Sequence, residues 1–306
     1  MIRVLIIILG LCIVSCSPYK TFYKKTYTAN DDLLNNKVYR ITINSNDEAN
    51  SMPLASLHKL ASIKFINTSF KDIDNVFKKI PNPEKLKVLI LDSLGLKSLP
   101  NSISRFKNLS QIALNSNPEL DFDSTFKILK DLPIVFFNLQ DNKLTQIPES
   151  ITEFNTLKDL NLSNNSISKE ENFSTLTQLP KLTSLWLTNN NLKVLPKTIG
   201  ALSQLKNLYI EHNQLTNLPS EISGMKKVWV VHAGHNLFEE LPPEFATMKG
   251  LFLLHVNNCK IKSIPEIYST KASHVLGLIM DNNNLSDSEK AKWKKEMRHY
   301  FLLSLE

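Results

Sequence analysis

Apolar residues recur along this chain at a fixed spacing. A clear unit begins at Leu182 and places further leucines at Leu185, Leu187, Leu192 and Leu195, and the next unit begins 23 residues later. The other clear units begin at Leu86, Leu109, Ile134, Leu157, Leu205, Val228, Leu251 and Val275, and weaker copies begin at Val38 and Leu60. A period of about 20 to 50 residues is typical of a solenoid whose neighbouring units share one core.

Each unit predicts a short strand followed by a turn. If Leu182 is position one, positions four and six are apolar and alternate with outward positions, as in a strand with one buried face. An asparagine at position nine can satisfy backbone groups in a turn, because its amide both donates and accepts hydrogen bonds. This asparagine recurs as Asn117, Asn142, Asn165, Asn190, Asn213, Asn236 and Asn283.

A proline at position fifteen marks where the chain has left the strand ladder and needs no backbone donor. It recurs as Pro100, Pro148, Pro196, Pro219, Pro242 and Pro265. The units from Leu109 and Leu157 run to about 25 residues and lack the Leu-Pro step. We therefore expect longer or more helical segments on the side of these units that faces away from the strands.

The repeat resembles the 23-residue leucine-rich-repeat pattern L-x-x-L-x-L-x-x-N-x-L-x-x-L-P-x-x-I-x-x-L over roughly residues 38–285, in about eleven units of which the first two are degenerate. The resemblance implies an α/β repeat solenoid, a horseshoe with a concave parallel sheet and short helices or loops on the convex side. Cys259 replaces the asparagine of its unit, which the family permits, so we expect a structural role for it.

A stack of repeats exposes its core at both ends and needs caps. Ser286 and Glu289 form a capping-box sequence, and Trp293, Met297 and Tyr300 follow with Phe301 at helical spacing. We therefore predict a C-terminal capping helix in residues 286–306. The segment 38–60 is the expected N-terminal cap.

The N-terminus resembles a bacterial lipoprotein signal. Residues 1–15 hold an apolar run of about eleven residues, short for a membrane-spanning helix, and the sequence Ile13-Val14-Ser15-Cys16 is similar to a lipobox. The resemblance implies that Cys16 is acylated and that the protein is lipid-anchored (palmitate among its acyl chains) in the bacterial cell envelope, facing the periplasm or the cell surface. The alternatives are an uncleaved anchor and a plain secretory signal.

Residues 16–37 follow as a polar lipidated tether. Its lysines, Lys20, Lys24 and Lys25, suit either anionic head groups or plain solvation.

Composition argues against several function classes. The net charge of +7 is spread over 306 residues without a basic stripe interleaved with aromatic residues, so we expect no nucleic-acid binding. The chain has no phosphate-binding glycine loop, no H-E-x-x-H and no G-x-S-x-G. We therefore expect a binding protein rather than an enzyme, without a cofactor.

The residue type at the outward position five of the strands changes along the array. It is small or polar in the first units and then becomes a run of ring-bearing residues, Trp186, Tyr209, His232 and His255. Trp and Tyr are enriched at binding hot spots. The predicted ligand platform on the concave face consists of Trp186, Tyr209, Trp229, His232, Phe252 and His255, flanked by His212, His235 and Glu211.

Two other interpretations of these side chains stay open. Large side chains on neighbouring strands can merely stabilise a sheet by stacking. A zinc site at His232 and His255, joined by His212 or His235, would have Glu211 as its nearest carboxylate. The platform suits a protein partner, which is the usual ligand class of the family, and a glycan or small ligand that stacks on its rings is the alternative.

Overall fold

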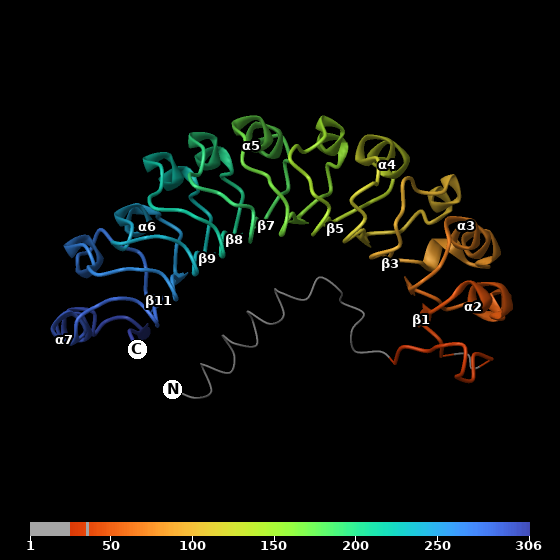
Figure 1. Cartoon of the computed structure of the whole chain (residues 1–306), viewed down its shortest axis with the longest axis horizontal. Helices are drawn as coiled ribbons and strands as arrows, with labels where there is room; N and C mark the ends of the chain where they lie inside the picture. Colours follow the sequence, from red (N-terminus) through yellow and green to blue (C-terminus); the bar gives the residue numbers. More distant parts are fainter. Residues whose placement is uncertain (1–24, 35–36) are drawn as a thin grey trace. The chain divides into compact units, whose positions relative to one another are not determined.

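The computed structural model describes residues 25–34 and 37–306, and the chain forms two compact units, Met1–Asn138 and Leu139–Glu306. Cys16 and the apolar run before it lie outside the described residues. In both units the strands pair in parallel with their sequence neighbours and the short helices lie on the opposite side of each coil (Figure 1). The predicted α/β repeat architecture is confirmed.

The described part of the first unit contains five strands. They are β1 (Arg40–Ile43), β2 (Ser62–Phe65), β3 (Val88–Ile90), β4 (Gln111–Ala113) and β5 (Phe136–Asn138). The opposite side carries α2 (Asn46–Ser51), α3 (Phe70–Lys79) and α4 (Phe122–Leu129), with 3-10 helices η1 (Leu54–Ser56), η2 (Pro83–Lys85) and η3 (Asn101–Arg105).

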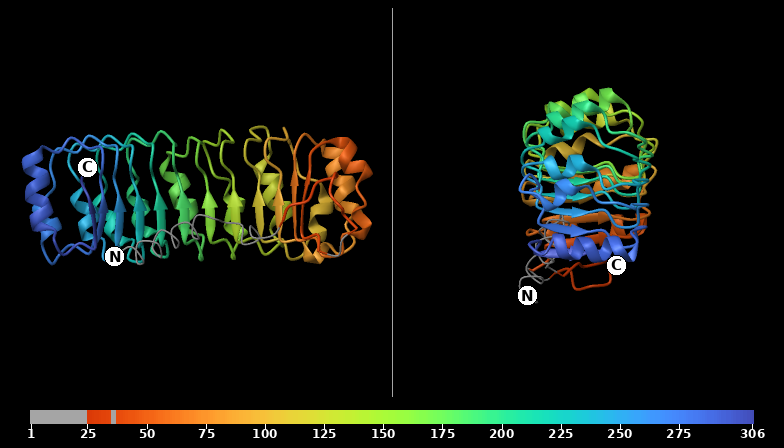
Figure 2. Two further views of the ribbon diagram at one scale, coloured as in Figure 1. Left: turned by 90° about the horizontal axis from the view of Figure 1, so that it is seen from below. Right: turned by 90° about the vertical axis from the view of Figure 1, so that its left-hand side faces the viewer.

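The second unit contains seven strands. They are β6 (Asp159–Asn161), β7 (Ser184–Trp186), β8 (Asn207–Tyr209), β9 (Val230–His232), β10 (Leu253–His255), β11 (Gly277–Ile279) and β12 (Leu302–Ser304), which lie side by side in Figure 2. The helices are α5 (Glu170–Thr177), α6 (Pro243–Thr247) and α7 (Asp287–Glu296), with η4 (Glu149–Glu153), η5 (Lys197–Ala201), η6 (Ser220–Gly224) and η7 (Glu266–Ser269).

The core of each coil is built from the apolar positions of the repeat. Leu182, Leu185 and Leu187 are 2%, 0% and 0% exposed, and the equivalent residues of the other units are buried as well. Burial of a leucine side chain stabilises a fold by about 2 kcal/mol, so the repeated leucines hold the coils together. The two units without the Leu-Pro step carry the eight-residue helices α4 and α5, whereas most Leu-Pro units form 3-10 turns. This confirms the predicted difference.

The asparagines at position nine form an internal hydrogen-bond ladder. In one turn the Oδ1 atom of Asn213 accepts from the backbone N–H groups of Asn190 and Leu192, at 2.9 and 3.0 Å. The Nδ2 atom of Asn213 donates to the carbonyls of Leu187 and Ile210. Each buried amide therefore pairs backbone groups of its own coil and the preceding one, which would otherwise be left unsatisfied.

The C-terminal cap differs from the prediction. The helix begins as expected, with the Ser286 side chain accepting from the Glu289 N–H at 3.2 Å, but α7 ends at Glu296. Residues 302–304 then form β12, which pairs with β11, so the predicted helix through residue 306 is wrong in its second half. The physical reason is that β12 pairs backbone groups along the edge of β11, which a continuing helix would leave without partners.

The predicted tether is also structured over part of its length. Tyr27 forms a parallel bridge to Ile41, accepts from the Thr42 N–H at 2.9 Å, and donates its own N–H to the Arg40 carbonyl. A neighbouring turn is held by the ion pair between Lys25 and Asp31 at 2.8 Å. Tyr27 thus covers the edge of β1, and the ordered fold begins before residue 38.

Candidate ligand-binding face

Four ring-bearing side chains form a continuous stack, the ring column, on the strand face of the second unit. The strand register aligns Trp186 with Tyr209, Tyr209 with His232, and His232 with His255. Successive ring centroids lie 4.8, 4.7 and 4.3 Å apart. The first two pairs are parallel stacks, and the two histidines are tilted by 46°. The structure therefore brings together the four position-five residues that the sequence singled out.

The column is not uniformly accessible. Tyr209 is only 5% exposed, whereas Trp186, His232 and His255 are half-buried. A ring in the middle of a stack contributes its buried area to the sheet and leaves little surface for a ligand. The stabilising interpretation therefore fits Tyr209, and the half-buried Trp186 retains surface for contact.

A second group of apolar side chains lies beside the column, at position two of the repeats. Trp229 is 58% exposed, and its ring meets the half-buried Phe252 edge to face with 5.6 Å between centroids. Phe301 stacks on Phe252 with 4.8 Å between centroids and is 42% exposed, and Leu276 is 37% exposed. We call Trp229, Phe252, Leu276 and Phe301 the apolar ridge.

Sequence reasoning found only half of this ridge. It assigned Phe301 to the capping helix and did not consider Leu276. The available signal was the segment Tyr300–Leu305, which follows the L-x-x-L-x-L spacing once residue 300 is taken as position one of a partial unit. Gly277 makes the contact possible, because a Cβ atom there would lie 2.9 Å from the Phe301 ring.

The remaining predicted histidines lie at the turn after the strands. His212 and His235 stack with 4.0 Å between ring centroids, and both are exposed. Both have left-handed backbone angles, with φ of 53° and 55°, as position eight does in many of the repeats. The Asn258 side chain continues this row with a 3.2 Å contact to His235. The two histidines therefore form an exposed row separate from the ring column.

Glu211 is the carboxylate associated with these imidazoles. Its Oε1 atom lies 3.7 Å from Nδ1 of His232, and its side chain is 29% exposed. Partial burial raises the pKa of Glu211, but interaction with His232 and the nearby His255 and His212 outweighs it and leaves the pKa below its ordinary value. Glu211 is therefore an anion at neutral pH.

Two of the histidines are held neutral by their surroundings. Burial, reinforced by repulsion from His232, lowers the pKa of His255 to about 4. The Nε2 atom of His255 is buried without a hydrogen-bond partner. The pKa of His235 is also lowered, by desolvation and by its neighbour His212. At neutral pH these two side chains contribute ring surface rather than positive charge.

The structure does not support the zinc hypothesis. Within residues 25–34 and 37–306, no group of three or more His, Cys, Asp or Glu side chains is placed to hold a metal ion. His232 and His255 belong to the ring column, whereas His212 and His235 form the exposed row at the turn, and Glu211 approaches His232 only at 3.7 Å.

Cys259 lies inside the asparagine ladder. It is 8% exposed, and its sulfur accepts from the Asn236 N–H at 3.4 Å. Burial raises the pKa of its thiol. The thiol therefore substitutes for the amide of its repeat, as expected from its position, and is poorly suited to nucleophilic chemistry.

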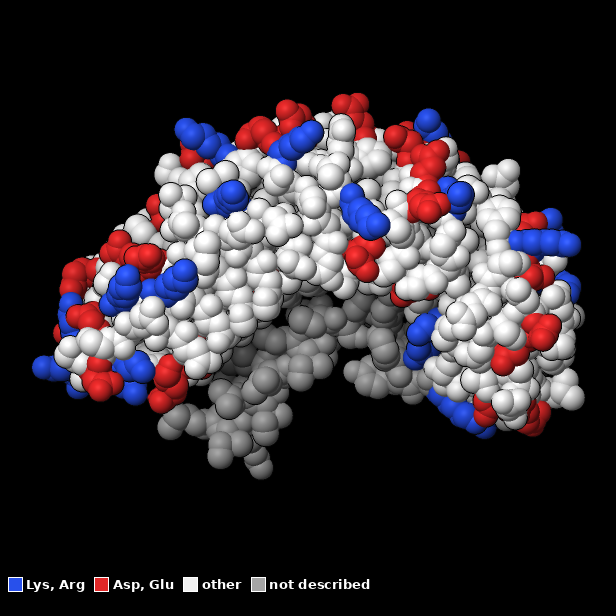
Figure 3. Space-filling model, viewed as in Figure 1, with Lys and Arg blue, Asp and Glu red and all other residues white. Residues whose placement is uncertain are grey.

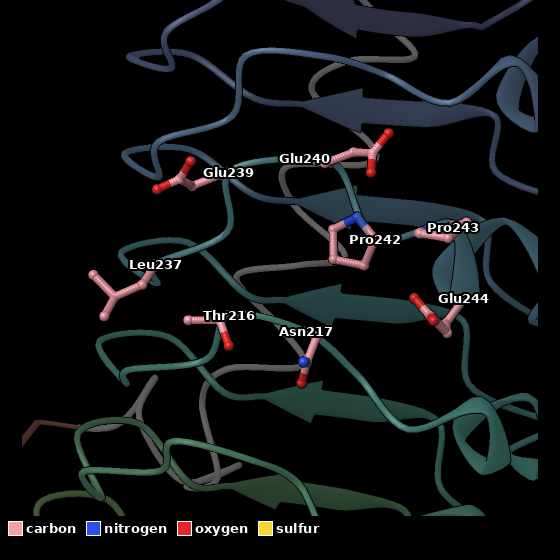
Figure 4. A pocket seen from close by; sticks show the side chains of 8 residues that line it. All are labelled: Thr216, Asn217, Leu237, Glu239, Glu240, Pro242, Pro243 and Glu244. Carbon is pink, nitrogen blue, oxygen red and sulfur yellow. The ribbon is translucent and has the colours of Figure 1, made fainter.

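A separate cavity opens where the chain passes from the strands to the short helices (Figure 4). Its volume is 420 Å³ and its lining consists of Thr216, Asn217, Leu237, Glu239, Glu240, Pro242, Pro243 and Glu244. Lys262 pairs with Glu239 at its rim, at 3.0 Å. It shares no residue with the ring column or the ridge.

Charged side chains do not gather into a basic stripe on the face shown in Figure 3. Lys and Arg are interspersed with Asp and Glu along the helix-bearing side of each unit. No helix among the described residues is long and apolar enough to span a bilayer.

Comparison with known proteins places the repeats in a family. A family model described as a leucine-rich repeat region matches residues 134–268. The probable inactive serine/threonine-protein kinase roco10 of Dictyostelium discoideum is 33% identical over 138 residues. That match covers 43% of this chain but 5% of the kinase, so the likeness concerns a small part of the relative.

Solved structures share the fold. An internalin of Listeria monocytogenes superposes with a TM-score of 0.59 at 17% identity, over 88% of this chain and 74% of the internalin chain. A chain of the Toll–Spatzle complex of Drosophila gives a TM-score of 0.61 at 18% identity, over 92% of this chain and 44% of its own length. The family match thus identifies residues 134–268 as a leucine-rich-repeat region, and the solved structures show that the chain has the same repeat fold.

Proposed function

We propose that this protein is a recognition module that binds a protein partner on the strand face of residues 139–306. The observation that carries the proposal is the apolar ridge, in which Trp229 and Phe301 are 58% and 42% exposed beside the ring column. Exposed aromatic side chains that lie together supply contact area at little entropic cost. Leucine-rich-repeat proteins generally mediate recognition between proteins, which agrees with this assignment.

A protein partner suits the ridge better than a glycan does. Beside the ridge lie position-three residues that are also apolar, among them the half-buried Val230 and Leu302. These side chains have no hydrogen-bonding groups for the hydroxyls of a sugar, whereas they can pack against apolar side chains of a protein. Glycan binding is the alternative outcome of the test below.

We further propose that Cys16 is lipidated and that the protein is anchored in a bacterial cell envelope. The support is the lipobox-like sequence that ends at Cys16, after an apolar run of about eleven residues. Several acyl chains hold a protein at a membrane far longer than one chain does. Labelling cells with an alkyne fatty acid tests this: the wild-type chain becomes labelled, and a Cys16→Ala variant that still carried label would refute lipidation at this residue.

The recognition proposal is tested by photocrosslinking in cells from two matched positions. A photoreactive amino acid replaces Trp229, on the ridge, or Val194, which is also 58% exposed but lies outside the strands, between β7 and η5. We expect a discrete protein crosslink from position 229 and none from position 194. No discrete product from position 229, or the same products from both positions, would contradict the proposal, and retention on a glycan array without a protein crosslink would favour the alternative.

A further inference from the structure

Glu211 is an anion without a fixed cation beside it. Among the described residues its ion-pair partner is His232, at 3.7 Å, and the groups that lower its pKa are all histidines. Lys206 belongs to the same repeat but is five residues earlier, about 16 Å away along an extended strand. A partly buried carboxylate attracts a permanent cation from a ligand more strongly than a fully exposed carboxylate does.

The surroundings of Glu211 suit a flat cationic group. Glu211 lies two residues beyond Tyr209, the last residue of β8, and its carbonyl still accepts from the Asn189 N–H at 3.0 Å, so the two side chains point to the same side of the extended chain. The equivalent position on the next strand is Gly234, which has no side chain, and the one after that is Asn257. The Asn257 side chain lies over Gly234, where a Cβ atom would come within 2.7 Å of it. The Glu211 carboxylate and the Asn257 amide therefore belong to the repeats on either side of Gly234, which has no side chain.

We infer that Glu211 is the anchor for an arginine side chain of the protein that binds the strand face. This inference rests on the proposed function and specifies the chemistry of the partner. A guanidinium can give two parallel hydrogen bonds to the carboxylate, has further N–H groups for the Asn257 amide, and can lie flat beside aromatic rings. The Glu211 side chain is 29% exposed, and this partial exclusion of water strengthens its attraction for a cation.

The partner would therefore place an arginine at Glu211 and apolar side chains on the ridge. The carboxylate and the ridge lie on neighbouring repeats, because Glu211 follows β8 whereas Trp229 and Phe252 immediately precede β9 and β10. One partner segment that crosses these strands can reach both groups. Charge selects the partner and the apolar ridge supplies most of the contact area.

The inference is tested with arginine amide as the probe and citrulline amide as its uncharged analogue. The full chain is labelled with ¹⁵N in its histidines, and the His232 imidazole signal is followed at pH 7.5 during titration with each compound. We expect arginine amide to shift the His232 signal saturably, with a dissociation constant in the millimolar range. Citrulline amide should bind at least tenfold more weakly, and Glu211→Gln should show no shift. The control Glu239→Gln, at an exposed glutamate of the separate cavity, should bind arginine amide as the wild type does.

Three outcomes would overturn the inference: no saturable shift in the wild type, equal shifts with both compounds, or an unchanged titration in Glu211→Gln. Folding of each variant is verified by its melting temperature and by its histidine spectrum. A failure of the arginine anchor can be distinguished from a failure of the proposed function. If crosslinking from position 229 captures a partner whose affinity Glu211→Gln leaves unchanged, recognition by the strand face stands and the arginine anchor fails.

Discussion

The indole ring of Trp186 lies parallel to the phenol ring of Tyr209, with 4.8 Å between the centroids and 6° between the planes. The two residues nevertheless differ in burial, since Tyr209 is 5% exposed and Trp186 is half-buried. The same stack therefore contains one residue that mainly supports the sheet and one that retains surface for a ligand.

The buried Tyr209 of the ring column and the exposed Trp229 of the apolar ridge should respond differently to alanine substitution. Tyr209→Ala removes a buried ring and should lower the free energy of unfolding by about 3 kcal/mol. Trp229→Ala removes a ring that is mostly in solvent and should change it by less than about 1 kcal/mol. Urea unfolding of both variants measures the two effects. Equal losses of stability would contradict the assignment of separate roles.

The asparagine ladder predicts a large effect from a small substitution. Asn190 is fully buried, its Nδ2 donates to the Leu162 carbonyl at 3.0 Å, and its Oδ1 accepts from the Ile167 N–H at 2.9 Å. Asn190→Ala leaves these backbone groups unpaired and should lower the free energy of unfolding by about 2 to 4 kcal/mol. The neighbouring exposed Asn189 has a φ of 56° and donates to the Asn164 side chain at 2.8 Å, so Asn189→Gly is a control that relieves backbone strain and loses one exposed hydrogen bond. An Asn190→Ala variant as stable as that control would show that the ladder is dispensable.

The buried thiol of Cys259 predicts low reactivity in the folded protein. It is 8% exposed and its pKa is raised by burial, so little thiolate is present at neutral pH. Iodoacetamide should leave the Cys259 peptide largely unmodified in the native protein and alkylate it in urea, as measured by mass spectrometry. Rapid native alkylation would contradict a structural role. Cys259→Asn, which restores the amide of the repeat, should fold normally.

The lowered pKa of His255 predicts that acid destabilises the protein. Its pKa is about 4 in the fold, against 6.5 for an unperturbed histidine, because burial disfavours its charged form and His232 repels it. The unfolded chain therefore binds more protons between these pH values, so stability falls as the pH decreases from 6.5 towards 4. Glu211, the carboxylate that faces both imidazoles, opposes this shift without reversing it.

The contribution of His255 amounts to at most about 3 kcal/mol, from the size of the shift. It is isolated by comparing the wild type with His255→Gln in urea unfolding at pH 7 and pH 5. The wild type should lose more stability than the variant between these pH values. Parallel losses, or an NMR titration of His255 with a midpoint near 6.5, would refute the neutral buried state.

The sequence predicted the regular part of this structure because each regular feature depends on one unit and its neighbour. The periodic leucines locate the strands, and the asparagine at position nine pairs with the adjacent coil. The missing Leu-Pro step in two units accounts for α4 and α5. Alignment of the ring column followed from the same periodicity, since equal positions on neighbouring parallel strands lie side by side.

The features that the sequence did not predict depend on the ends of the array. Trp293, Met297 and Tyr300 are spaced for a helix, and that periodicity concealed the end of α7 at Glu296 and the strand β12. The stack of Phe301 on Phe252 requires the absence of a side chain at Gly277, 24 residues earlier. Such contacts between distant residues have no local pattern.

The central claim is that the apolar ridge binds a partner, and the affinity of purified variants for the protein crosslinked at position 229 tests it most directly. Trp229→Ala should weaken this affinity at least tenfold without a change in melting temperature, because aromatic residues in the centre of an interface carry much of its binding energy. Val194→Ala, at an equally exposed apolar residue outside the strands, should bind as the wild type does. Wild-type affinity in Trp229→Ala, or equal weakening in both variants, would contradict the account.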